Sequence, residues 1–202
     1  FSSGVTLSTS VINDKELSVI VRTNDQTLPQ IKDKDLKLVV SVRKEIVKTI
    51  ILRIKSLSNN LRLPVDDLPD GIIMLTLSTS EDFPLAERLI FIQPEQNPKI
   101  SIQPDKTKYK KRDPVSVKLA ISGDSINQET AFLSFSAAEG NFMDRIQEYT
   151  TTIASWFLLE SDVHGTVEGP SYYFDPSNPG RFKDLDLLLM TQGWRDFAWK
   201  SD

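Results

Sequence analysis

The chain has 202 residues, 39% of them hydrophobic and 26% charged, with a formal net charge of −4. It contains no cysteine, which excludes disulfide bonds, cysteine-based zinc sites, a thiol nucleophile and an internal thioester. A single histidine, His164, excludes a multi-histidine metal centre, and no glycine-rich phosphate loop is present. No uninterrupted apolar run approaches the ~18 residues that a membrane-spanning helix needs. We expect a globular chain that uses neither metal nor cofactor.

The first half of the sequence predicts β-strands. The chain itself begins without a leader of basic and then apolar residues, and we expect the chain to be a fragment of a longer protein. Residues 63–71 contain two prolines and an Asp-Gly pair, which favour a turn. Short segments that alternate apolar and polar residues, separated by turns, are typical of a β-sandwich. The expected strands are 5–8, 17–21, 36–42, 47–54, 72–77 and 86–92.

A domain boundary is predicted at residues 93–98, which contain two prolines and no apolar side chain. Strand patterns restart at 100–102, continue with a strict alternation over 115–121, and are expected again at 131–137. We therefore expect a mainly β chain of two Ig-like sandwiches in tandem, over residues 1–98 and 99–202.

The last third changes to a helical period. A first helix is predicted around residues 146–157 from apolar residues three and four positions apart. A second is predicted at residues 179–190, with Asn178 as its N-cap and Pro179 in its first turn. These helices are expected as additions to the second sandwich. The predicted apolar faces are Ile146, Tyr149, Ile153, Trp156 and Phe157 in the first helix, and Phe182, Leu185, Leu188 and Leu189 in the second.

A basic cluster surrounds Tyr109: Lys106, Lys108, Lys110, Lys111 and Arg112. It could form an anion or nucleic-acid patch, or a solvated loop whose lysines discourage strand-to-strand aggregation. Residues 1–98 carry 12 basic and 13 acidic side chains and residues 99–202 carry 12 and 15, so no nucleic-acid partner is expected. We favour the solvated loop.

Two groups of acidic residues suggest chemistry only weakly. Asp66, Asp67 and Asp70 lack the spacing of a calcium loop, and a solvated turn explains them better. Glu160, Asp162 and Glu168 could supply the carboxylate pair of a hydrolase, a pattern that almost any chain offers. His164 is expected in a surface loop. We therefore predict no catalytic residue.

Aromatic residues gather near the end of the chain: Tyr172, Tyr173, Phe174, Trp194, Phe197 and Trp199. Exposed aromatic rings beside prolines can stack on sugars or peptides. Alternatively, they pack the C-terminal helix against the second sandwich, which is the interpretation we favour. The candidate ligand-binding residues are Tyr172, Tyr173, Phe174 and Trp194.

Several segments resemble a known family. Residues 68–77 and 86–92 resemble the end of a macroglobulin-like (MG2-type) domain, and residues 105–109 with 115–119 look like the opening strands of the next. Residues 160–174 with 185–195 are similar to large Gram-negative envelope proteins, in which such modules precede a carboxypeptidase-regulatory-like or TonB-dependent receptor plug region. At positions 110–113 the chain departs from the Pro-Gly-Glu that often follows the tyrosine.

The resemblance implies a function without catalysis. It implies macroglobulin-like sandwiches, export to the periplasm or outer membrane, and a scaffold or binding module, associated with TonB-linked nutrient uptake. Its partners would be neighbouring domains of the parent protein, with membrane attachment only through parts outside this chain. A glycan- or peptide-binding module that uses the aromatic residues is the alternative, and a carboxylate-based hydrolase is less favoured.

Overall fold

The computed structural model describes residues 2–13, 15–93, 99–122, 133–138 and 150–192. The chain forms two compact units, and their order along the sequence is interleaved. The first unit consists of Phe1–Gln93 and Ile146–Asp202, and the second is the intervening Pro94–Arg145. We call them the sandwich unit and the inserted unit.

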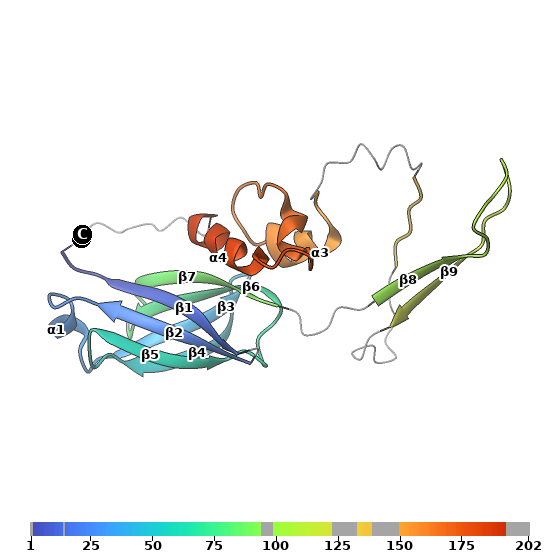
Figure 1. Ribbon diagram of the computed structural model, residues 1–202. Coiled ribbons are helices and arrows are strands. Elements are labelled where there is room, and N and C mark those ends of the chain that lie inside the picture. Colours follow the sequence, from blue (N-terminus) through green and yellow to red (C-terminus); the bar gives the residue numbers. More distant parts are fainter. Residues whose placement is uncertain (1, 14, 94–98, 123–132, 139–149, 193–202) are drawn as a thin grey trace. The chain divides into compact units, whose positions relative to one another are not determined.

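The sandwich unit contains two antiparallel sheets, joined between β2 and β3 by the short helix α1 (Leu28–Ile31) (Figure 1). The three-stranded sheet has the order β1 (Val5–Asn13), β2 (Glu16–Thr23), β5 (Ser58–Pro64). The four-stranded sheet has the order β4 (Glu45–Arg53), β3 (Asp35–Val42), β6 (Gly71–Thr79), β7 (Pro84–Ile92). The chain is therefore mainly β, as the strand patterns predicted.

The core of this unit lies between the two sheets. Val19 of β2 and Leu63 of β5 pack in one buried cluster with Leu38 and Val40 of β3 and with Leu75 of β6. The register of β3 and β6 pairs Leu38 with Leu77 and Val40 with Leu75. Because side chains alternate faces along a strand, this register places one apolar row of each strand inside. Each such side chain contributes roughly 1.5–3 kcal/mol when fully buried.

Strands β6 and β7 are apolar on both faces. On β6, Ile73 faces the core between the sheets, whereas Ile72 belongs to a second buried cluster on the outer face. On β7, Ile90 belongs to the core between the sheets and Leu89 to the cluster on the outer face. A continuous apolar run is typical of a strand that is covered on both sides. The outer face therefore needs a third layer.

Helical segments from the far end of the chain form that layer. They are α3 (Ile153–Ser155), the π-helix η1 (Trp156–Glu160), the 3₁₀-helix η2 (Pro170–Phe174) and α4 (Arg181–Gln192). Figure 1 shows α4 and α3 over β7 and β6. Leu159, Leu185 and Leu189 pack in one cluster with Ile72 and Leu89. A capping box between Thr152 and Ser155 begins the layer.

This arrangement corrects the prediction that the helices extend the second sandwich. Residues 150–192 belong to the sandwich unit because the apolar outer face of β6 and β7 supplies the surface they bury. The division at residue 98 therefore marks the start of an insertion, and residues 99–202 do not form one domain.

The apolar face predicted for the first helix is also wrong where the structure describes it. Ile153, Trp156 and Phe157 are 72%, 51% and 57% exposed, while Leu159 is fully buried. The π-helical bond from the Ser161 N–H to the Trp156 carbonyl, 2.9 Å, changes which side chains face the sheet. Ile146 and Tyr149 lie outside the described residues. In α4, Leu185 and Leu189 are buried as expected, whereas Phe182 is 40% exposed.

The described part of the inserted unit is a β-hairpin of β8 (Lys99–Pro104) and β9 (Val117–Ser122). Its register pairs Ile100 with Ile121 and Ile102 with Leu119, so these four apolar side chains share one face. Of the strand predicted at 131–137, residues 133–137 have no regular secondary structure and no partner strand among the described residues, and residues 131–132 lie outside them. Among the described helices, none is long and apolar enough to span a membrane.

Candidate functional site

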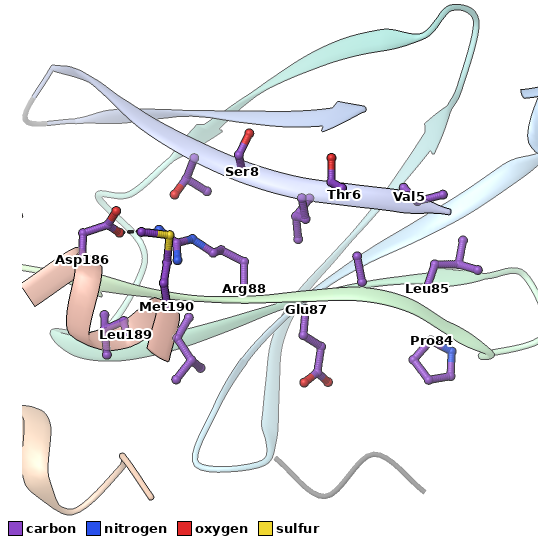
Figure 2. A pocket seen from close by; sticks show the side chains of 14 residues that line it. Val5, Thr6, Ser8, Pro84, Leu85, Glu87, Arg88, Asp186, Leu189 and Met190 are labelled. Atoms are coloured by element: carbon purple, nitrogen blue, oxygen red, sulfur yellow. Dashed lines mark hydrogen bonds and ion pairs between the residues drawn. The ribbon is translucent and has the colours of Figure 1, made fainter. Parts of the chain in front are cut away.

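A groove opens between the free edges of the two sheets, beside α4. It has a volume of about 590 Å³. Figure 2 shows β1 and β7 running along its two sides and α4 at one end. We call it the edge groove. Its lining comes from residues 5–9 of β1, residues 84–89 of β7, and Asp186, Leu189 and Met190 of α4.

The sheet topology explains why the groove is there. In the described part of the chain, β1 pairs only with β2 and β7 pairs only with β6. Each strand therefore has one edge whose backbone N–H and C=O groups have no strand partner, and these two edges face the groove. The three α4 residues follow a spacing of three and four, which places them on one side of the helix.

One ion pair provides the charge in the groove. The Arg88 guanidinium on β7 donates a hydrogen bond to the Asp186 carboxylate on α4 at 2.5 Å. The Arg88 side chain is 10% exposed and that of Asp186 is 49% exposed. Glu87 points away from β1 (Figure 2) and accepts a hydrogen bond from the Thr76 hydroxyl at 3.2 Å. The guanidinium has further N–H donors that could hold a carboxylate or hydroxyl of a ligand.

The remaining lining is mainly apolar. Leu189 is buried and Met190 is 49% exposed. The hydroxyls of Thr6 and Ser8 point away from β7 (Figure 2), and that of Ser8 accepts a hydrogen bond from Arg22 at 2.9 Å. The groove therefore suits an apolar ligand with one polar end, or an extended peptide that pairs with a free strand edge.

The aromatic residues predicted to bind a ligand lie in η2, away from the groove lining. Tyr172, Tyr173 and Phe174 are half-buried. Phe174 packs edge-to-face on Phe91 of β7 at 5.9 Å between ring centroids, and Tyr172 on Tyr173 at 5.3 Å. Trp194, with Phe197 and Trp199, lies outside the described residues. A ligand role for this set stays a prediction, while the described rings contribute to packing of the helical layer.

The two tyrosines have perturbed hydroxyls. The Tyr172 hydroxyl donates to Asp184 on α4 at 2.8 Å, and this carboxylate raises the pKa of Tyr172. Burial raises the pKa of Tyr173. Both effects extend the neutral form of the phenols to higher pH, which suits rings that pack in the helical layer.

Two of the three acidic residues considered for hydrolysis are engaged in structural contacts. Glu160 accepts hydrogen bonds from Thr151 at 2.9 Å and from Ser155 at 2.8 Å. Asp162 accepts one at 3.1 Å from Arg43, in the turn between β3 and β4. Glu168 is exposed, and so is His164, which lies on the surface as expected.

Asp66, Asp67 and Asp70 are also exposed, in the turn between β5 and β6. Over the described residues, no group of His, Cys, Asp and Glu side chains is placed to hold a metal ion.

The edge groove was not predicted from the sequence. Its polar pair, Arg88 and Asp186, comes from segments 98 residues apart. The apolar runs at 72–77 and 89–92 were the available signal, because strands covered on both faces predict a further layer. That signal indicates a layer but does not say which segment supplies it.

Comparison with known proteins identifies no family. No family model matches the chain, and no curated protein gives a significant match. Part of the chain is similar to two solved structures of a β-glucosidase from Kluyveromyces marxianus. The selenomethionine-labelled form has a TM-score of 0.31 at 13% identity, and the complex with glucose 0.30 at 14%. Each alignment covers 46% of this chain and 14% of the glucosidase chain, and likeness at this level carries no functional argument.

Proposed function

We propose that this chain is a structural and binding module, without catalysis, of a large cell-envelope protein. The observation that carries the proposal is the attachment of the helical layer to the sandwich. Leu159, Leu185 and Leu189 share a buried cluster with residues of β6 and β7. The Arg88–Asp186 pair joins β7 to α4, and the Arg43–Asp162 pair joins the β3–β4 turn to the segment after η1. A unit built from two separated segments of the chain, with a further segment inserted between them, suits a scaffold that carries neighbouring domains.

The macroglobulin-like resemblance supports the location and the partners in this proposal. It places the module in the periplasm or at the outer membrane, in a TonB-linked nutrient-uptake system. The partners are then neighbouring domains of the parent protein, which also provide its membrane attachment. In this proposal β8 and β9 open a second macroglobulin-like sandwich. Their shared face, with Ile100 57% and Ile102 61% exposed, would receive an opposing sheet.

Peptide binding is the second candidate function, and the edge groove favours it. Two free strand edges beside an apolar lining are the elements by which proteins add an extended peptide as a further strand. This function uses residues different from the aromatic set, for which glycan or peptide stacking stays an alternative.

One experiment separates these functions. The purified chain is tested on glycan and peptide arrays beside a Tyr172→Ala/Tyr173→Ala variant and a Met190→Glu variant. Binding lost only with the tyrosine pair would assign recognition to the aromatic set, and binding lost only with Met190→Glu would assign it to the groove. Phe83→Ser, at a residue 55% exposed outside the groove, is the matched control.

The scaffold proposal also predicts that the helical layer and the sheet beneath it unfold together. Native-state hydrogen exchange should show α4 amides opening with the same free energy as those of β6 and β7, because all three share one buried cluster. Independent opening of α4 at low free energy would contradict a rigid composite module.

A further inference from the structure

The loop between β8 and β9, residues 105–116, carries a concentration of positive charge. Five of its residues are basic and two are acidic, in a chain whose net charge is −4. We call it the basic loop. All five cationic side chains are exposed: Lys106, Lys108, Lys110, Lys111 and Arg112.

The backbone of the basic loop is organised by its own polar groups. Asp105 accepts hydrogen bonds from the Tyr109 hydroxyl at 2.7 Å and from the Ser116 amide at 3.0 Å. The Tyr109 oxygen in turn accepts one from the Lys106 amide at 3.1 Å, and Asp113 accepts one from the Lys110 amide at 2.8 Å. The cations are therefore presented on an ordered loop, which reduces the entropy lost on binding.

The same hydrogen bonds engage both acidic side chains within the loop. Asp105 and Asp113 bind a phenol and backbone amides, and within the described residues no ion pair joins them to the five cations. Five basic and two acidic side chains leave the loop with a net charge of +3. The remainder of the chain is acidic, so attraction to an anionic partner is concentrated here.

We propose that the basic loop binds the phosphate headgroups of an anionic phospholipid surface. Clusters of four to eight Lys and Arg side chains are the pattern that anionic membranes attract. One exposed apolar residue of the loop follows the cations, Val115 at 56% exposure, and such a side chain can enter the boundary between headgroups and acyl chains. This contact would add to any membrane attachment made by other parts of the parent protein.

The aromatic residue of the loop argues for lipid over nucleic acid. Single-stranded nucleic acids bind where aromatic rings are free to stack on bases. The Tyr109 hydroxyl is bound to Asp105, and the Lys106 ammonium lies over its ring at 5.8 Å from the centroid. Tyr109 is therefore engaged within the loop, and the cations around it are suited to a surface of phosphates.

The test is vesicle co-sedimentation of the intact chain. Vesicles of phosphatidylglycerol and phosphatidylcholine should bind it, vesicles of phosphatidylcholine alone should not, and added salt should weaken the binding. The variant Lys108→Glu/Lys111→Glu, which leaves the internal hydrogen bonds in place, should lose affinity by about tenfold or more. The matched control is Lys32→Glu/Lys34→Glu, two exposed residues of the sandwich unit that change the net charge equally.

Three results of the vesicle experiment would overturn the proposal. They are equal losses in both variants, binding that does not depend on the anionic lipid, and release by inorganic phosphate at a concentration matching the lipid phosphate. The last would indicate a site for free phosphate. Single-stranded DNA is tested in parallel, and tighter loop-dependent binding of DNA than of vesicles would reject the lipid surface.

Discussion

Arg88 of β7 donates a hydrogen bond to Asp186 of α4 at 2.5 Å, across 98 positions of the sequence. Arg88 is the more enclosed partner, at 10% side-chain exposure against 49% for Asp186. The pair connects the free edge strand of the four-stranded sheet to the helical layer, and it also forms the polar end of the edge groove. The same contact therefore serves the stability of the module and the chemistry of its groove.

Removing this contact should destabilise the chain. Arg88→Ala is expected to lower the free energy of unfolding by about 1.5–3 kcal/mol, because a hydrogen bond between charged groups is lost at a largely buried position. Urea unfolding followed by circular dichroism measures the change. Arg62→Ala removes an exposed pair with Glu16 at 3.7 Å and should cost about 1 kcal/mol at most. Equal losses in the two variants would contradict the importance given to the Arg88 contact.

Truncation of two residues of η1 should change the free energy of unfolding by very different amounts. Leu159 is fully buried against β6 and β7, so Leu159→Ala should cost about 2–5 kcal/mol through lost contacts and a cavity. Phe157 is 57% exposed, and Phe157→Ala should stay within about 0.5 kcal/mol of the parent chain. Chemical denaturation compares them. A larger loss in Phe157→Ala than in Leu159→Ala would support the buried face that the helical period predicted, which includes Phe157.

Glycine is required at position 71 for two reasons. Gly71 has φ +97°, and a Cβ built there lies 3.3 Å from the Leu158 carbonyl oxygen of η1. Gly165 has a comparable φ of +88° but no atom within 4 Å of such a Cβ. Both Ala variants should lose about 1–2 kcal/mol to backbone strain. Gly71→Ala should lose more because β6 and η1 must also separate slightly, and thermal unfolding of the two variants makes the comparison.

The basic loop should show two linked titrations. The hydrogen bond from Tyr109 lowers the pKa of Asp105, and the same bond raises the pKa of Tyr109. The contribution of Asp105 is therefore present above its ordinary pKa and is lost as the pH falls through the lowered value. The contribution of Tyr109 is present below its ordinary pKa and is lost as the pH rises through the raised value. The loop is most stable between these limits.

Residue-resolved NMR tests this coupling. Asp105→Asn should bring the pKa of Tyr109 back toward about 10, the value of an unperturbed tyrosine. Asp113→Asn provides the control, since Asp113 binds the Lys110 amide and does not contact the phenol. A Tyr109 titration that is unchanged in Asp105→Asn would show that the loop is organised differently.

Local features of the sequence predicted much of the sandwich unit. The alternation at 36–42 corresponds to β3, and the apolar run at 72–77 lies within β6, which begins at Gly71, the last residue of the turn predicted at 63–71. The predicted boundary at 93–98 coincides with the end of the first segment of this unit. These features are readable because alternation and turn chemistry depend on neighbouring residues alone.

The helical layer shows what the sequence left undetermined. Its period indicated helices, and Leu185 and Leu189 were correctly expected on an apolar face. The period could not show which sheet that face would cover, or that a π-helical turn would bury Leu159 and leave Trp156 exposed. Those outcomes depend on shape and packing between segments far apart in the chain.

By itself, therefore, the sequence determined most strands of the sandwich unit and excluded thiol and multi-histidine chemistry within this chain, because these follow from composition and local pattern. It did not predict β5, and it predicted a strand at 131–137 where the described residues have no regular secondary structure. Only the tertiary structure decided that the end of the chain returns to the first sandwich and that β1, β7 and α4 enclose a groove. It also decided that Arg88 meets Asp186. The physical reason is that the apolar outer face of β6 and β7 is buried by the segment whose shape packs best against it, here the helical layer. Such packing depends on residues far apart in the chain and cannot be predicted from a local pattern.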